Sequence, residues 1–146
     1  MKSLHWLVLA SAAVAVAGCS GQPSPEAKIS CGTVDSVAYV ATSGAPIAFY
    51  MVQKSITATD DGAGGPVPAN GIVATVISPV ASVQICKGDC LDGNGSFGQE
   101  KDVTTDDNAI LKYTLQLDPD GPFTGSVTES FNAVSQCETD VTIGAL

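Results

Sequence analysis

The stretch AILKYTLQLD, residues 109–118, has the clearest periodicity in the chain. Its apolar side chains stand at every second position, at Leu111, Tyr113, Leu115 and Leu117. Because successive side chains of a β-strand point to opposite faces, these four share one face, and Lys112, Thr114 and Gln116 share the other. The stretch therefore predicts a strand with one face packed in a core and the other in water.

Six further segments show weaker alternation, and turn-forming residues separate them. They are residues 37–42, 47–59, 71–78, 82–86, 123–131 and 140–146. The segment 47–59 changes phase between Phe49 and Ile56, which predicts a bulge or a break near Gln53. No stretch has the apolar spacing of an amphipathic helix. Short strands with regular turn signals predict an all-β fold, a β-sandwich of about seven strands.

The first eighteen residues, MKSLHWLVLASAAVAVAG, have the composition of a secretory leader. Lys2 supplies a positive charge, and an apolar stretch follows from Leu7 to Ala17. A membrane-spanning helix needs about 20 apolar residues, so this stretch is too short to cross a bilayer. We predict that residues 1–18 are a signal peptide that is removed.

The leader ends in VAGC, from Val16 to Cys19. This motif resembles the lipobox of bacterial lipoproteins, and the resemblance implies that Cys19 carries a diacylglyceryl thioether and becomes the acylated first residue. The alternative is an ordinary signal peptide, which would leave Cys19 as an unpaired fifth cysteine. Two or three acyl chains hold a protein firmly to a membrane that it does not span. Residues 19–30 are predicted to be the lipidated cysteine and a flexible tether.

The location follows from the same resemblance. Ser20 follows the cysteine, where an aspartate would imply retention at the inner membrane by similarity to enterobacterial lipoproteins. We therefore expect a lipid-anchored protein of the cell envelope, at the outer membrane or cell surface rather than at the inner membrane.

Removal of the leader excludes several kinds of chemistry. His5 and Trp6, the one histidine and the one tryptophan, are lost with it, and the chain has no arginine. Five lysines then remain against fifteen acidic residues. Histidine-dependent catalysis and histidine metal ligands are excluded, and so strong a negative charge disfavours nucleic acid. We expect no enzyme, no nucleic-acid partner, and a protein or surface partner that the sequence does not identify.

Four cysteines remain for disulfides once Cys19 is lipidated, and three pairings are open. They are Cys31, Cys86, Cys90 and Cys137. Cys86 and Cys90 flank a short turn, which favours pairing them with each other and Cys31 with Cys137. A redox pair and a thiolate metal site are weaker interpretations, because the spacing of two cysteines with three residues between them suits neither.

Three further stretches follow an order that suggests a family. They are SITATDDGAGGPVPANGIVATV (55–76), VTTDDNAILKYTLQL (103–117) and DGPFTGSVTESF (120–131). Together they resemble the strands and turns of a bacterial immunoglobulin-like domain of the invasin and intimin type. Ala109 stands where that family usually has glycine, and the cysteine-containing insertion at 86–98 is atypical. The resemblance covers about residues 47–146 and implies an immunoglobulin-like sandwich used for adhesion or as a spacer. Residues 31–46 lie outside the pattern, and the whole domain is predicted to span residues 31–146.

Acidic turns raise the question of a bound cation. Asp92, Asn94 and Ser96 alternate as the first ligands of an EF-hand do, but Phe97 and Val103 replace the required glycine and glutamate. Immunoglobulin-like topology would instead gather three loops at one end of the sandwich. These loops carry Asp60, Asp61, Asp118 and Asp120, with Asp92 as a further member. The hypothesis is a weak calcium site; the alternative is solvated turn residues.

These observations predict a membrane-anchored bacterial lipoprotein that presents one immunoglobulin-like domain. The domain would act as a surface adhesion or binding module or as a structural spacer. The alternative function is a periplasmic accessory subunit of an envelope complex, which would dock through an exposed strand edge.

Overall fold

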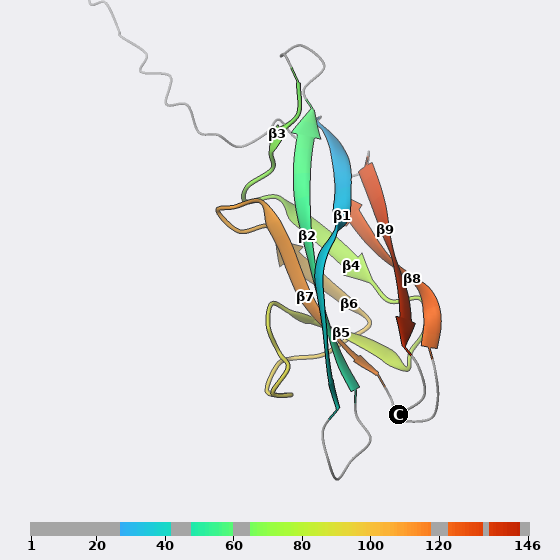
Figure 1. Cartoon of the computed structure of the whole chain (residues 1–146). Coiled ribbons are helices and arrows are strands. Elements are labelled where there is room, and N and C mark those ends of the chain that lie inside the picture. Colours follow the sequence, from blue (N-terminus) through green and yellow to red (C-terminus); the bar gives the residue numbers. More distant parts are fainter. Residues whose placement is uncertain (1–26, 42–47, 60–64, 118–122, 133–134, 144–146) are drawn as a thin grey trace, which may run out of the picture.

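The computed structural model describes residues 27–41, 48–59, 65–117, 123–132 and 135–143. These residues form two antiparallel sheets that pack face to face, as Figure 1 shows. The prediction of an all-β sandwich is confirmed, with nine strands in the described residues. No helix in this part of the chain is long and apolar enough to cross a membrane.

The first sheet has the strand order β1-β2-β7-β5, and β3 adds a short pairing to β2. Its strands are β1 (Lys28–Ala41), β2 (Ala48–Thr59), β3 (Val67–Pro68), β5 (Val83–Lys87) and β7 (Ile110–Leu117). The second sheet has the order β6-β4-β8-β9. Its strands are β4 (Val73–Ile77), β6 (Glu100–Thr104), β8 (Phe123–Phe131) and β9 (Ser135–Ile143).

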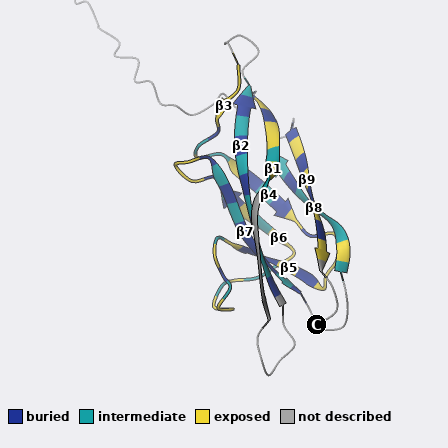
Figure 2. Cartoon of the chain, in the orientation of Figure 1, coloured by how far each residue is buried: buried dark blue, intermediate teal, exposed yellow. Residues whose placement is uncertain are grey.

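The core lies between the two sheets and is built by alternation along the strands (Figure 2). The four apolar side chains of the 110–117 strand are all buried, as their spacing predicts. Val76 from β4 and Val127 and Phe131 from β8 supply the facing side. At about 25 cal/mol per Å² of apolar area, this burial is the main force that holds the sheets together.

The change of phase in β2 has a different cause from the expected bulge or break near Gln53. β2 pairs with β7 without interruption from Ala48 to Ser55, and the register shifts lie on β1 instead, opposite Lys54 and Gln53. Phe49 is buried on the outer face of the sheet, where Phe97 packs against it at 5.8 Å between ring centroids. Phe49 is therefore buried on the outer face without a bulge in β2, while Met51 in the same phase is half-buried.

The sandwich begins earlier than the expected boundary at Cys31. β1 starts at Lys28, and Ala27 and Ile29 are buried. The backbone N–H of Ile29 donates to Ser135 Oγ at 3.0 Å, which attaches this segment to the second sheet. The last four residues assigned to the tether are therefore part of the folded domain.

Candidate functional site

Four polar side chains meet in the middle of the apolar core. We call them the inter-sheet cluster: Lys54 on β2, Tyr113 on β7, Glu129 on β8 and Thr139 on β9. Each sheet contributes two of them. Lys54 is 2% exposed and Glu129 is 0% exposed. The cluster therefore places an ammonium and a carboxylate where the rest of the interior is apolar.

Strand alternation explains why these side chains point inward. Lys54 lies between Val52 and Ile56 in the buried phase of β2. Glu129 lies between Val127 and Phe131 in the buried phase of β8. Because both neighbours of each charge are fixed in the core, neither residue can turn outward without reversing its strand.

The hydrogen bonds of the cluster form a closed network. Lys54 Nζ lies 3.0 Å from Glu129 Oε2 and donates to Thr139 Oγ1 at 2.7 Å. The hydroxyls of Tyr113 and Thr139 both donate to the other carboxylate oxygen, Glu129 Oε1, at 2.5 and 2.6 Å. One oxygen of Glu129 thus faces the amine, and the other receives two hydroxyl donors.

The electrostatics keep the phenol protonated. Burial raises the pKa of Tyr113 well above its usual value of 10.0, and the charge of Glu129 and the hydrogen bond between them add to this increase. Tyr113 therefore donates to Glu129 throughout the physiological pH range. Among the described residues, Asn70 Oδ1 is the one buried side-chain polar atom without a hydrogen-bond partner, so the cluster is fully satisfied.

The buried ion pair between Lys54 and Glu129 carries a cost in desolvation free energy. Removing two charges from water costs several kcal/mol per ion, and well-packed apolar residues in their place are often neutral or stabilising. Stability alone does not account for an ion pair at this position. The signal for this pair in the sequence is a lysine in one strand and a glutamate in another, each at a position whose neighbours two residues away are apolar. Neither residue was predicted to belong to a site.

The first disulfide joins the two sheets at one edge of the sandwich. Cys31 on β1 is bonded to Cys137 on β9, with 5.8 Å between their Cα atoms. The two residues are separated by 106 positions in sequence. The first and last described strands are therefore covalently connected, in the pairing that the sequence favoured.

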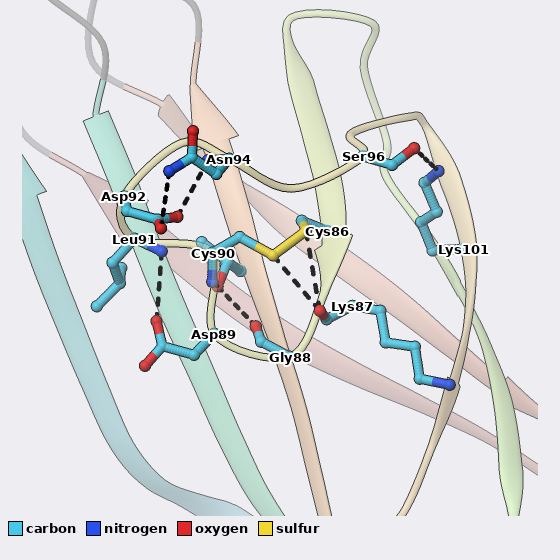
Figure 3. Close-up of a disulfide and its surroundings, with 11 residues drawn as sticks. Cys86, Lys87, Gly88, Asp89, Cys90, Leu91, Asp92, Asn94, Ser96 and Lys101 are labelled. Carbon is cyan, nitrogen blue, oxygen red and sulfur yellow. Dashed lines mark hydrogen bonds between the residues drawn. A yellow bond between two sulfur atoms is a disulfide. The ribbon is translucent and has the colours of Figure 1, made fainter.

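The second disulfide closes a small loop on the outer face of the first sheet. Cys86 is bonded to Cys90, with 6.3 Å between their Cα atoms (Figure 3). The N–H of Cys90 donates to Thr114 Oγ1 at 3.0 Å, and that hydroxyl donates to the Gly88 carbonyl at 2.7 Å. Gly95 passes so close that an added Cβ would overlap both sulfur atoms. The loop is thus built around a buried disulfide.

The oxygen atoms with EF-hand spacing do not converge. Asp92 accepts two hydrogen bonds from Asn94, one from the backbone and one from the side chain, while Ser96 accepts one from Lys101 Nζ (Figure 3). The backbone and side-chain hydrogen bonds from Asn94 lower the pKa of the Asp92 carboxyl. The described residues contain no group of three or more histidine, cysteine or acidic side chains that could hold a metal ion.

The other predicted ligands, Asp60, Asp61, Asp118 and Asp120, lie outside the described residues. Thr59 is the last described residue before the first pair, and Leu117 is the last before the second. Leu117 is paired with Ala48, at the opposite end of β2 from Thr59. The strands that lead into the two aspartate pairs therefore end at opposite ends of the sheet.

Cys19 also lies outside the described residues, so its lipidation stays a prediction. In comparisons with known proteins, no family model, no curated protein and no solved structure matches the chain. Neither resemblance seen in the sequence gains support from them. The function of the chain is therefore inferred from its own sequence and structure.

Proposed function

We propose that the chain is a bacterial lipoprotein, anchored through acylated Cys19, whose single β-sandwich acts as a surface binding module or spacer. The leader and its VAGC motif support the anchor. The observation that carries the functional part is the covalent connection between β1 and β9.

Force on a domain that is anchored at one end enters through the strand nearest the anchor. A domain held by its N-terminal lipid receives any pull from a bound partner through β1, which is an edge strand of its sheet. An edge strand separates from a sandwich by breaking its pairing with one neighbour. Because Cys31 is bonded to Cys137, β1 cannot separate without β9, which belongs to the other sheet. This arrangement suits a module that must stay folded while it is anchored at one end.

The outer surface of the second sheet supports an exposed role. Its solvent-facing positions include four carboxylates: Glu100 and Asp102 on β6, and Glu138 and Asp140 on β9. These four negative charges are repelled by an anionic membrane surface. This face of the sandwich therefore favours a domain that stands away from the bilayer.

The alternative function, an accessory subunit that docks through a strand edge, has one observation in its favour. β1 is 14 residues long and lies at the edge of its sheet. Its two register shifts, on either side of Val34, weaken this alternative, because bulges distort an edge and oppose the addition of another strand.

Two experiments test the proposal. Cys19→Ser should move the protein from the detergent phase to the aqueous phase, and equal partitioning of variant and parent would contradict the anchor. Protease treatment of intact cells should degrade the domain if it faces outward. Degradation only after the outer membrane is permeabilised would favour the accessory role. Ser20→Asp is the matched control for sorting, since it keeps the lipid and should retain the protein at the inner membrane.

A further inference from the structure

We propose that the side chains of Lys54 and Glu129 condense to an intramolecular amide bond, so that the inter-sheet cluster is a self-processing cross-link site. The inference is independent of the proposed surface function. It rests on the geometry of the cluster and on the chemistry of an amine beside a carboxyl group.

The reacting groups are already in contact. Lys54 Nζ lies 3.0 Å from Glu129 Oε2, one of the two oxygens bonded to the carboxyl carbon that the amine would attack. Each side chain is flanked by buried residues on a strand that is paired within its own sheet. Forming the bond therefore costs little further conformational freedom. Effective molarities for groups oriented in this way reach about 10⁵–10⁸ M.

The second carboxyl oxygen has the donors that the reaction needs. Attack on the carboxyl carbon places negative charge on Glu129 Oε1, which already receives the hydroxyl groups of Tyr113 at 2.5 Å and Thr139 at 2.6 Å. Fixed donors aimed at an oxygen where charge develops lower the barrier to acyl transfer. Thr139 also accepts from Lys54 Nζ at 2.7 Å, which directs the amine toward the same carboxyl group.

The step balances without an oxidant or a co-reactant. A proton moves from the Lys54 ammonium to Oε2, which gives a neutral amine and a carboxylic acid. The nitrogen lone pair then forms the bond to the carboxyl carbon, and a second proton passes from nitrogen to Oε2. The carbon–Oε2 bond breaks and water leaves, so that an ammonium and a carboxylate become one amide and one water molecule.

Burial favours the product. In water the separated ions are strongly solvated, but Lys54 and Glu129 are 2% and 0% exposed. A neutral amide avoids the cost of holding two charges in the core, and its carbonyl keeps the two hydroxyl donors. The cross-link would join β2 in one sheet to β8 in the other, and reductants would not break it.

Peptide mapping of the full-length protein tests the proposal directly. The protein is reduced, alkylated, denatured and cleaved with trypsin, which cuts after the lysines of the chain. We expect residues 29–87 to stay uncut at Lys54 and to be joined to residues 113–146, lighter by one water molecule than the two peptides together. Complete release of separate peptides 29–54, 55–87 and 113–146 would overturn the proposal.

Two variants sharpen the result. Lys54→Arg keeps a cation beside Glu129 but removes the nucleophilic amine, and trypsin still cuts after arginine, so the three peptides should separate. Tyr113→Phe removes one donor to Oε1 and should slow the formation of the cross-link by about 100-fold in a pulse-labelled time course. An unchanged rate in Tyr113→Phe would overturn the role given to the phenol.

Discussion

The two disulfides of this sandwich differ in what they connect: one joins distant strands of the two sheets, and the other closes a short loop. Cys31–Cys137 spans 106 positions and connects β1 in one sheet to β9 in the other. Cys86–Cys90 spans four positions and lies on the outer face of a single sheet. The first constrains how the sheets are joined, and the second constrains a loop.

The first disulfide stabilises the whole sandwich, and the second stabilises one loop. A cross-link that closes a long loop removes more conformational entropy from the unfolded chain than one that closes a short loop. Lys54 and Glu129 belong with the first disulfide, because they also connect the two sheets. The small loop is instead held by local contacts to Thr114 and Gly95.

The largest effect is expected from removing the long-range disulfide. Cys31→Ala together with Cys137→Ala should lower the free energy of unfolding by about 5 kcal/mol in the chain-entropy description. The reason is the length of the chain between the two residues. Urea unfolding monitored by far-UV circular dichroism measures the change. A loss below about 1 kcal/mol would mean that the sheets hold β1 without the disulfide.

The second effect comes from breaking the inter-sheet cluster. Glu129→Leu leaves the Lys54 ammonium buried without its carboxylate and should cost at least about 3 kcal/mol. The same urea unfolding experiment measures it. A change near zero would show that Lys54 reaches solvent in the variant.

A double variant separates the two descriptions of the cluster. Lys54→Met with Glu129→Gln removes both charges and keeps a side-chain oxygen that can accept from Tyr113 and Thr139. If the pair is held by ionic attraction alone, this variant should regain or exceed the parent stability. If the amide forms, the double variant should stay less stable than the parent, because the covalent connection is lost.

The third effect concerns the local disulfide. Cys86→Ala with Cys90→Ala should cost about 2 kcal/mol, because the closed loop is short. Thermal unfolding at matched protein concentration measures this change beside the Cys31 and Cys137 variant. An equal loss in both would contradict the distinction between the two bonds.

Gly95 offers a matched test of the same loop. In the parent, Gly95→Ala brings a methyl group onto both sulfur atoms and should cost about 1–3 kcal/mol through overpacking. In the Cys86→Ala and Cys90→Ala background the sulfur atoms are absent and only the Cβ of residue 90, 2.9 Å from the added methyl group, remains, so the cost should fall but not vanish. An unchanged cost would place the strain in the backbone instead.

The strongly periodic strands could be predicted from the sequence, and the weakly periodic ones could not. The segment 123–131 matches β8, and the stretch that opens at Ala109 contains β7. β6 was missed because EKDVT has a single apolar residue, Val103, which is too little for a periodic signal. The start of β1 was missed for a similar reason, since its first residues are mostly polar.

The inter-sheet cluster could not be predicted from alternation, because alternation assigns apolar residues to the buried face of a strand and polar residues to the exposed face. Lys54 and Glu129 occupy inward positions, and a charged residue in such a position resembles an interruption of the pattern. The cluster becomes visible only in the structure, where side chains of β2 contact side chains of β8 and β9 in the opposite sheet. The turn at Ala109 shows a related limit: its φ of 60° suits the glycine that the family resemblance implies, yet the chain has alanine there.

The smallest effect, and the most local, is the titration of Asp92 in the disulfide loop. The backbone N–H and the side-chain amide of Asn94 each donate to this carboxylate at 3.0 Å, and they lower its pKa from the usual 3.8. Since the folded pKa is below the unfolded value, the stabilisation is present above the unfolded pKa and is lost as the pH falls through the folded one. An NMR titration should give a midpoint below 3.8 for Asp92, with loss of protection of the Asn94 amide over the same pH range. Asn94→Ala removes the side-chain donor and keeps the backbone donor, so the midpoint should rise only part of the way. A midpoint at or above 3.8 in the parent would mean that the turn holds its shape without the charge.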